Sequence, residues 1–187
     1  DVPVAALADD LAQRVRSGTL IAVSRRPGVP GRAFTSAEMV ALERETVGLM
    51  RQGQGAYPML ATAVTRQAVQ HASPHLSDAQ HAAVDRILAN RDRVVALEGV
   101  AGAGKTTALA AVREGAAWEG YRVEGFAPTS RAAQKLADAG IPTTTLQHHL
   151  ALAAVADTAR HLYVLDESSL ASTRQMHALL QRLKPED

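Results

Sequence analysis

Apolar residues recur at helical intervals through the first part of the chain. Residues 4–16 place Ala and Leu at those intervals, and the β-branched run 19–23 that follows is typical of a short strand. Two Pro-Gly pairs within residues 25–32 then mark a loop. The pattern predicts a small unit of mixed helix and strand, with a short strand or a hairpin, at the start of the chain.

A second helix is predicted directly after this loop. Thr35 and Glu38 have the spacing of a capping box, apolar residues then recur on one face, and Gly53 stands where a C-terminal cap belongs. A third helical stretch over residues 58–70 leads to Pro74, which lies in a polar cluster typical of a boundary. We therefore predict an N-terminal accessory domain over residues 1–76 and a second domain over residues 77–187.

The second domain alternates short apolar runs with helical stretches. Strands that alternate with helices indicate a parallel, wound sheet, and such sheets hold their ligands at the carboxyl ends of the strands. The expected strands are 94–98, 121–126 and 161–166. One expected helix ends near residue 117, and two more lie within 127–140 and 145–154.

Composition limits the classes of protein to consider. The chain has 187 residues, 47% of them apolar, which is enough for one core or for one core with a smaller appendage. It contains no cysteine, so disulfides and thiolate metal sites are excluded, as suits a reducing cytoplasm. No apolar run approaches the roughly 20 residues that span a bilayer, so we expect no membrane insertion. The net charge of +1 leaves nucleic acid open as a partner.

The stretch EGVAGAGKTT, residues 98–107, carries the strongest chemical signal. It fits G-x-x-x-x-G-K-[ST] between a predicted strand and a predicted helix, which is typical of a loop whose backbone N–H groups hold phosphates. Lys105 would reach the β- and γ-phosphates of ATP, and the Thr106 hydroxyl would bind Mg²⁺. The alternative is a glycine-rich turn with an exposed lysine. The residues expected to bind the nucleotide here are Gly99, Gly102, Gly104, Lys105, Thr106 and Thr107.

Two acids follow the third predicted strand. Asp166 at its tip is suited to the Mg²⁺ shell, and Glu167 could orient and deprotonate a water molecule. An NTPase that uses ATP for motion needs such a base, whereas a small-molecule kinase does not. We therefore expect Lys105 and Glu167 to be catalytic. The alternative is that the two acids only open a helix that starts near Ser172.

Several segments resemble the motifs of a known family. LEGVAGAGKTT, APTSRAAQKLADAGI and LYVLDESSL are similar to motifs I, Ia and II of superfamily 1 DNA helicases. In combination they are most similar to the helicase part of the MobF-type conjugative relaxase-helicases, as are FTSAEMVALERETVGLMRQGQG and LSDAQHAAVDRIL further upstream. The resemblance covers nearly all of the chain, but its specificity is uneven, because many ATPases share motif I.

The resemblance implies a RecA-like P-loop NTPase fold and ATP-driven movement on single-stranded DNA from 5′ to 3′. It implies ATP and Mg²⁺ as cofactors, and single-stranded DNA and other conjugation proteins as partners during plasmid transfer in the bacterial cytoplasm. Such a helicase needs a second RecA-like lobe with an arginine that completes the ATP site. We therefore interpret residues 77–187, with motifs Q, I, Ia, Ib and II, as an incomplete first motor domain (1A) in a fragment with little or no turnover by itself.

The same resemblance implies contacts with DNA within motif Ia and at the position of the family's next motif, Ib. Thr129 and Ser130 fall at the start of a predicted helix, where hydroxyl and N–H groups can hold a backbone phosphate, and Arg131 adds positive charge. Thr145 and His148 match the family's next motif less tightly. The alternatives are an ordinary N-cap with solvated basic residues, and a histidine on a helix surface.

Gln80 has two interpretations. By resemblance it is the glutamine that reads the adenine edge in helicases. By spacing, Ser77 and Gln80 form an S-x-x-Q capping box, which would occupy the same side chain at its own helix terminus.

Two other functions stay open on the sequence. One is a P-loop ATPase that does not act on DNA, for which single-stranded DNA would give no stimulation. The other is a noncatalytic docking module of a transfer complex, in which changes to Lys105 and Glu167 would leave function intact.

Overall fold

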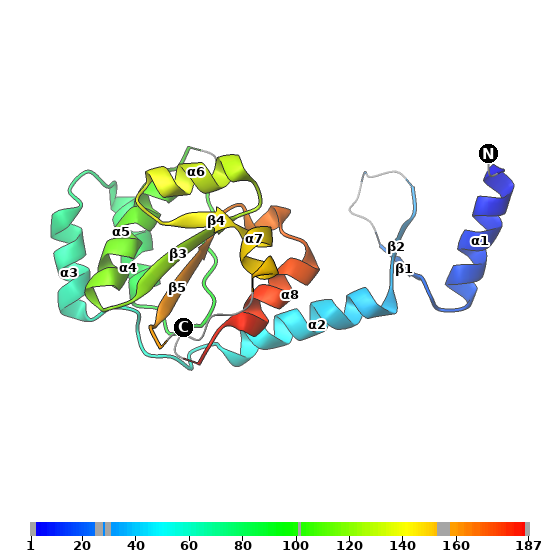
Figure 1. Ribbon diagram of the computed structural model, residues 1–187, viewed down its shortest axis with the longest axis horizontal. Coiled ribbons are helices and arrows are strands. Elements are labelled where there is room, and N and C mark those ends of the chain that lie inside the picture. Colours follow the sequence, from blue (N-terminus) through cyan, green and yellow to red (C-terminus); the bar gives the residue numbers. More distant parts are fainter. Residues whose placement is uncertain (1–2, 25–27, 29–30, 101, 153–157, 186–187) are drawn as a thin grey trace.

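The computed structural model describes residues 3–24, 28, 31–100, 102–152 and 158–185 of the chain. Figure 1 shows a body built around a small sheet, and an arm that extends from the body to the N-terminus. The sheet of the body is parallel and carries helices on both faces, which confirms the predicted α/β fold class. The arm contains α1 (Val4–Arg16), β1 (Ile21–Val23) and β2 (Ala33–Thr35), and α2 (Ala37–Gln52) joins it to the body.

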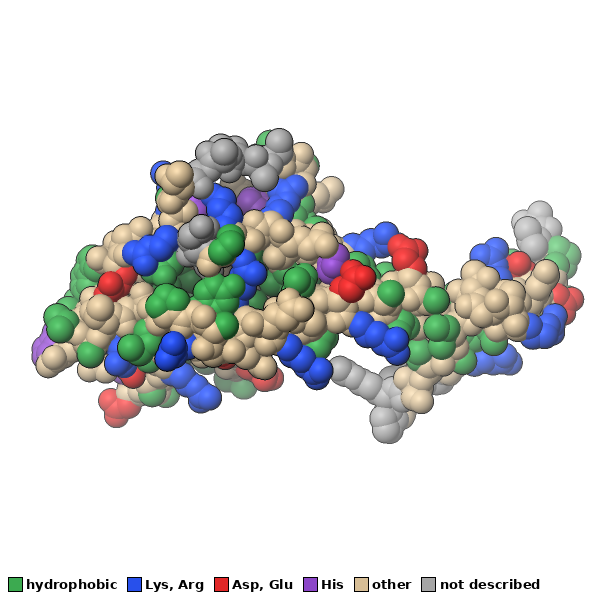
Figure 2. Space-filling model, turned by 90° about the horizontal axis from the view of Figure 1, so that it is seen from below, with side chains coloured by type: hydrophobic (Ala, Val, Ile, Leu, Met, Phe, Trp, Pro, Cys, Tyr) green, Lys and Arg blue, Asp and Glu red, His purple; other side chains and the backbone are tan. Residues whose placement is uncertain are grey.

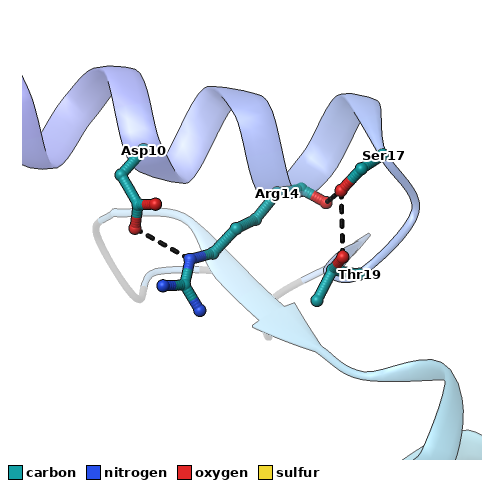
Figure 3. A network of polar contacts seen from close by, with 4 residues as sticks. All are labelled: Asp10, Arg14, Ser17 and Thr19. Carbon is teal, nitrogen blue, oxygen red and sulfur yellow. Dashed lines mark hydrogen bonds and ion pairs between the residues drawn. The ribbon is translucent and has the colours of Figure 1, made fainter.

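The arm consists of the predicted first helix and an antiparallel hairpin. Strands β1 and β2 pair with Ile21 opposite Thr35. None of the residues of α1, all of which the structure describes, is buried. Its polar contacts are local, because Arg14 Nε donates to Asp10 Oδ2 at 2.8 Å and Ser17 Oγ donates to the Arg14 carbonyl at 3.1 Å (Figure 3). Exposed contacts of this kind stabilise a helix little.

The N-cap of helix α2 lies one residue later than predicted. Thr35 is the last residue of β2 and is held extended by the hairpin, so the predicted capping box of Thr35 and Glu38 is wrong. Ser36 is the N-cap instead, and its hydroxyl accepts a hydrogen bond from the Met39 N–H at 3.1 Å. Gly53 is the C-cap, as predicted.

Helix α2 packs along α8 (Thr173–Arg182) of the body. Arg174 Nη2 lies 2.7 Å from Glu38 Oε1, and His177 Nε2 lies 3.2 Å from Glu45 Oε2. Thr46 is buried in α2, and its hydroxyl is satisfied by donating to the Leu42 carbonyl at 2.7 Å. The arm is therefore attached to the body through the length of α2.

Three helices form the larger core of the body, and they are α3 (Ala63–Ala72), α4 (Asp78–Leu88) and α5 (Lys105–Trp118). Val69, Val84, Leu88 and Val112 are buried together where these helices meet. Helix α3 begins at residue 63 rather than 58, because Thr62 caps it by accepting from the Thr65 N–H. The predicted division of the chain at residue 76 stays a prediction, and Val69 and Val84 pack together across it.

The sheet of the body contains β3 (Arg122–Ala127), β4 (Thr143–Thr145) and β5 (His161–Leu165). Its strand order is β4-β3-β5, and all its pairs are parallel. Helix α6 (Ser130–Asp138) follows β3, and helix α7 (Leu146–Ala151) follows β4. Val123 and Val164 pack with α5 and α6 on one face, whereas Phe126 packs with α7 and α8 on the other. This alternation follows the two-residue period of a strand. The 3₁₀ turn η1 (Ser168–Leu170) follows β5.

Residues 94–98 do not form the predicted strand. The structure assigns them to no ladder, and Val95 is 41% exposed. An apolar run becomes a strand only where a neighbouring strand takes up its backbone groups, and the described sheet consists of β3 with β4 and β5 on its two sides. Residues 143–145, three threonines in succession, supply β4, which the sequence did not predict.

Candidate nucleotide-binding site

The carboxyl edge of the sheet gathers residues that follow different strands. The parallel register places Ala127 of β3 opposite Thr145 of β4, and Phe126 opposite Leu165 of β5. Asp166 follows β5 directly, and its N–H donates to the Phe126 carbonyl at 2.9 Å. The predicted Mg²⁺ ligand and the predicted DNA-binding threonine therefore lie at one edge of the sheet.

Helix α5 brings its N-terminus to the same edge. Its C-terminal end is tied to the start of β3, because the Tyr121 N–H donates to the Ala116 carbonyl at 3.0 Å. The helix has 14 residues and β3 has 6, so both are about 20 Å long at roughly 1.5 and 3.3 Å per residue. Since α5 runs back along the strands, Lys105 at its start lies level with their carboxyl ends.

The glycine loop before α5 is curled. Gly102 and Gly104 have φ values of 80° and 72°, in the left-handed region that favours glycine. Gly104 is the N-cap of α5, with no side chain to occupy the free N–H groups of the first turn. The Ala103 N–H donates to the Val100 carbonyl at 3.2 Å across the turn. The loop is therefore curled at both glycines, and its role as a phosphate cradle stays a prediction; residue 101 lies outside the described residues.

Lys105 folds back over this loop. Its ammonium Nζ donates to the Gly99 carbonyl at 2.6 Å and to the Val100 carbonyl at 3.1 Å. The positive charge is thus held at the rim of the loop by two neutral acceptors, which phosphate oxygens can replace with a stronger, charged interaction. Thr106 and Thr107 occupy the first turn of α5, where Thr106 is half-buried and Thr107 exposed.

Two acids stand beyond β5 in an unusual backbone geometry. Glu167 has φ 50° and ψ 40°, and no other non-glycine residue among those described has a positive φ. The Asp166 carboxylate accepts from the Glu167 N–H at 2.9 Å, which helps to hold this turn. Strained residues of this kind concentrate at functional sites. Ser172 caps α8 through a capping box with Gln175, so the alternative that the acids open this helix is wrong.

The donor set fits the cofactors that the sequence predicts. A threonine hydroxyl and an aspartate carboxylate are hard oxygen ligands of the kind that Mg²⁺ prefers. Among the described residues, no three His, Asp or Glu side chains form a cluster that could hold a metal without further ligands. Mg²⁺ in this site would therefore complete its shell with phosphate oxygens and water.

Gln80 connects the start of α4 with the glycine loop. The capping box predicted for it is confirmed, because the Ser77 N–H donates to Gln80 Oε1 at 2.8 Å and the Gln80 N–H donates to Ser77 Oγ at 3.3 Å. Its Nε2 atom donates to the carbonyls of Ala103 and Gly104, each at 3.3 Å. Local sequence patterns do not reveal this contact, because it joins segments more than 20 positions apart.

The predicted DNA contacts lie at two helix starts on the same edge. Thr129 and Thr145 are the N-caps of α6 and α7, and their hydroxyls accept from the Ala132 and His148 N–H groups at 3.2 Å. Ser130, Arg131 and His148 are exposed. The capping role that the sequence left open for Thr129 is therefore confirmed. An open hollow of about 240 Å³ lies beside these threonines, lined by Ser130, Gln134 and residues 143–145 among others.

Comparison with known proteins decides the family. The sequence model of the family described as the AAA domain matches residues 75–187. The chain belongs to the AAA domain family. The match begins just before α4 and includes the glycine loop and both acids of this AAA domain.

Several conjugation proteins are similar to the chain over a longer stretch than the AAA domain covers. It is 35% identical over 157 residues to the probable conjugal transfer protein TraA of Sinorhizobium fredii, and the match covers 76% of the chain and 13% of that relative. It is 36% identical over 159 residues to the conjugal transfer protein TraA of Rhizobium radiobacter, covering 79% of the chain and 14% of that relative. It is 27% identical over 181 residues to the multifunctional conjugation protein TraI of Escherichia coli K12, and the match covers 91% of the chain and 10% of that relative. The chain thus spans a small part of each relative.

Proposed function

We propose that the chain is a fragment of an ATP-dependent DNA helicase that moves 5′ to 3′ on single-stranded DNA in plasmid conjugative transfer, with residues 77–187 as part of its first motor domain and residues 1–76 as an accessory domain. The observation that carries the proposal is the curled glycine loop at the start of α5, at the sheet edge where Asp166 follows β5. The relatives named for conjugal transfer support the setting. We place this activity in the bacterial cytoplasm, with other conjugation proteins as partners. No helix among the described residues is long and apolar enough to cross a membrane.

The chain's own residues bind and orient the nucleotide. The N–H groups of the loop from Gly99 to Thr107 hold the phosphates, and Lys105 exchanges its two loop carbonyls for phosphate oxygens. Thr106 and Asp166 bind the Mg²⁺. Glu167, the exposed residue that follows Asp166, orients the attacking water. ATP supplies the phosphoanhydride bond whose hydrolysis drives movement. We expect little or no turnover from the chain alone, because the arginine that completes the ATP site of such a helicase comes from a second RecA-like lobe.

The DNA-binding surface lies at the starts of α6 and α7. Residues at these starts present hydroxyl and free N–H groups with one cationic side chain, which is the chemistry that holds a backbone phosphate. Since the Thr129 and Thr145 hydroxyls are occupied as caps, the exposed Ser130 and Arg131 are the first candidates for direct contacts. The proposed DNA-binding residues are Thr129, Ser130, Arg131, Thr145 and His148.

The salt dependence of binding to a short oligothymidine tests the DNA partner. The logarithm of the association constant should fall with the logarithm of salt by about 0.7 per phosphate contact, and Arg131→Gln should reduce the slope by about that amount. Arg86→Gln, at an exposed arginine of α4 outside the proposed surface, is the matched control and should leave the slope unchanged. A flat salt response of the unmodified chain would favour a P-loop ATPase that does not act on DNA.

The docking-module alternative is tested in the longer protein that carries this chain. Single-stranded DNA should stimulate its ATP hydrolysis, and Lys105→Ala and Glu167→Gln should each abolish that stimulation. Transfer that proceeds normally with either substitution would show that the domain serves only as a docking module.

A further inference from the structure

We propose that Arg182 is a positioning residue for DNA binding, which holds α7 in place on the proposed DNA-binding surface without contacting DNA itself. The inference rests on the proposed function, because α7 carries His148 and begins directly after Thr145. It starts from a forked contact between the end of α8 and the end of α7. Arg182 Nη1 donates to the His149 carbonyl at 2.7 Å, and Arg182 Nη2 donates to the Leu150 carbonyl at 2.6 Å.

Helix α7 is too short to be stable by itself. Its six residues make fewer than two turns, whereas an isolated helix in water needs about 12 residues. Tertiary contacts must therefore hold it. The Thr145 hydroxyl caps its start by accepting from the His148 N–H at 3.2 Å. Leu146 is buried in a cluster with Phe126 of β3 and Leu179 of α8, which fixes one side of the helix on the sheet.

Arg182 gives the last turn of α7 the hydrogen-bond donors that it lacks. The last four carbonyls of a helix have no partner within the helix, and those of His149 and Leu150 are among them. The guanidinium meets both carbonyls with its fork, and its positive charge complements the negative end of the helix dipole. Hydrogen bonds from a charged donor are stronger than those between neutral groups, and partial burial of this contact limits its screening by salt.

Helix α8 is a firm base for this contact. Its start is fixed by the capping box of Ser172 and Gln175. It also packs along α2, where Arg174 Nη2 lies 2.7 Å from Glu38 Oε1. Arg182 is the last residue of this helix, so its guanidinium extends to α7 from an element that is anchored elsewhere. The position of α7 on the DNA-binding surface therefore depends on α8 through one side chain.

The test separates positioning from direct contact. Arg182→Met keeps the length of the side chain and removes its donors and its charge. Binding of the 187-residue chain to a short oligothymidine should weaken by a factor of roughly 10, because α7 then spends only a fraction of the time in its binding position. The slope of the logarithm of the association constant against the logarithm of salt should stay unchanged, since no phosphate contact is lost. The affinity for MgATP should also stay unchanged.

Arg86→Met is the matched control, because it makes the same substitution at an exposed arginine of α4 outside the proposed surface. It should leave both affinities unchanged. A slope that becomes shallower by about 0.7 in Arg182→Met would contradict the inference, because Arg182 would then contact a phosphate itself. Equal losses of oligothymidine and MgATP affinity would also contradict it, because they would indicate a general structural defect.

The pKa of His149 gives an independent measure of the contact between α7 and α8. Burial, followed by the charge of Arg182, lowers this pKa below its ordinary value. In Arg182→Met, titration of the His149 ring by NMR should show the pKa raised toward the ordinary value. An unchanged pKa would mean that Arg182 does not hold this end of α7.

The outcomes separate this inference from the proposed function. If the unmodified chain binds no oligothymidine even at low salt, the proposed DNA partner fails. If it binds and Arg182→Met binds as tightly, only the inference about Arg182 fails. Should Arg182→Met not fold, Arg182→Lys supplies the comparison, because a single ammonium group replaces the guanidinium fork and keeps the charge. Its loss of oligothymidine affinity should be smaller, again with an unchanged salt slope, and no loss would contradict the inference.

Discussion

At the scale of single residues, the backbone of Glu167 is where function and stability oppose each other. A left-handed conformation costs a residue with a Cβ about 1–2 kcal/mol, and the Asp166 carboxylate offsets part of that cost by accepting from the Glu167 N–H. A protein keeps such strain where a side chain must point in a particular direction. The geometry therefore supports a functional role for the Glu167 carboxylate.

Glu167→Gly should raise the free energy of unfolding by about 1 kcal/mol, because glycine adopts this conformation without strain. Glu167→Gln, which keeps the Cβ and removes only the charge, should leave stability within about 0.5 kcal/mol of the unmodified chain. Urea unfolding of the three proteins measures the difference. Equal stability of the two variants would mean that the turn at residue 167 is not strained.

His149 should make stability depend on pH. Burial, followed by the nearby Arg182, lowers the pKa of His149 below 6.5, and its ring lies 4.2 Å from that of Phe126 between centroids. Below pH 6.5, His149 therefore binds a proton more readily in the unfolded chain than in the folded chain. The stability that this difference contributes is fully present above pH 6.5 and is lost as the pH falls below it. His149→Phe keeps the ring packing without a titrating group. Its free energy of unfolding should fall less between pH 7 and 5 than that of the unmodified chain, and equal slopes would contradict this assignment.

At the scale of elements, the fit between β3 and its neighbours depends on Gly125. A Cβ atom there would overlap the Thr143 hydroxyl and lie 2.8 Å from Leu136 Cδ2. Thr143 cannot move freely, because its hydroxyl donates to the Ile141 carbonyl at 2.6 Å. The approach of β4 and α6 to the central strand is therefore set by a missing side chain.

Gly125→Ala should lower the free energy of unfolding by about 1–3 kcal/mol through overpacking. Gly48→Ala is the matched control, because a Cβ at Gly48 in α2 would meet nothing within 4 Å. It should raise stability by about 0.5–1 kcal/mol, as expected for alanine in a helix interior. Thermal unfolding measures both changes. A neutral Gly125→Ala would show that β4 can move aside.

Local patterns predicted most elements, and long-range pairing accounts for those they missed. The helix over residues 4–16 was predicted with its observed ends, because its periodicity and flanking turn are local. Residues 94–98 and 143–145 show the opposite. The first is apolar without a partner strand among the described residues, whereas the second is polar but pairs with β3. Partner strands lie far away in sequence, so neither outcome could be predicted from composition.

The same distinction holds for the candidate site. Parallel topology predicted that residues following different strands share one edge, and the register of β3 with β4 and β5 confirms it. The motif predicted the glycine loop at the start of a helix, and Gly104 is the N-cap of α5. The tie from Gln80 to the loop could not be predicted, because the capping box already accounted for that side chain.

At the scale of the whole molecule, the body and the arm differ in what holds them together. The body has several clusters of buried side chains, whereas α1 has no buried residue. Figure 2 shows the arm projecting from the body with hydrophobic and charged side chains side by side on its surface, and Val4 and Leu7 are 83% and 56% exposed. Helix α2, packed on α8, joins the two parts through a long interface.

The amide protons of α1 should therefore exchange with solvent much faster than those of α5. Local unfolding of α1 exposes little apolar surface, whereas opening α5 disrupts the core around Val112. Hydrogen exchange followed by mass spectrometry of peptides from the two helices measures the difference. Equal protection of both helices would contradict this description of the arm.

The central claim is that the backbone N–H groups of the glycine loop bind the phosphates of a nucleotide. The most direct measurement is the ¹⁵N–¹H spectrum of the chain as MgATP is added. The Gly102, Gly104 and Lys105 amide signals should shift most, and Lys105→Ala should abolish the shifts of the two glycine signals. Shifts confined to other parts of the chain, or no shifts at saturating MgATP, would contradict it.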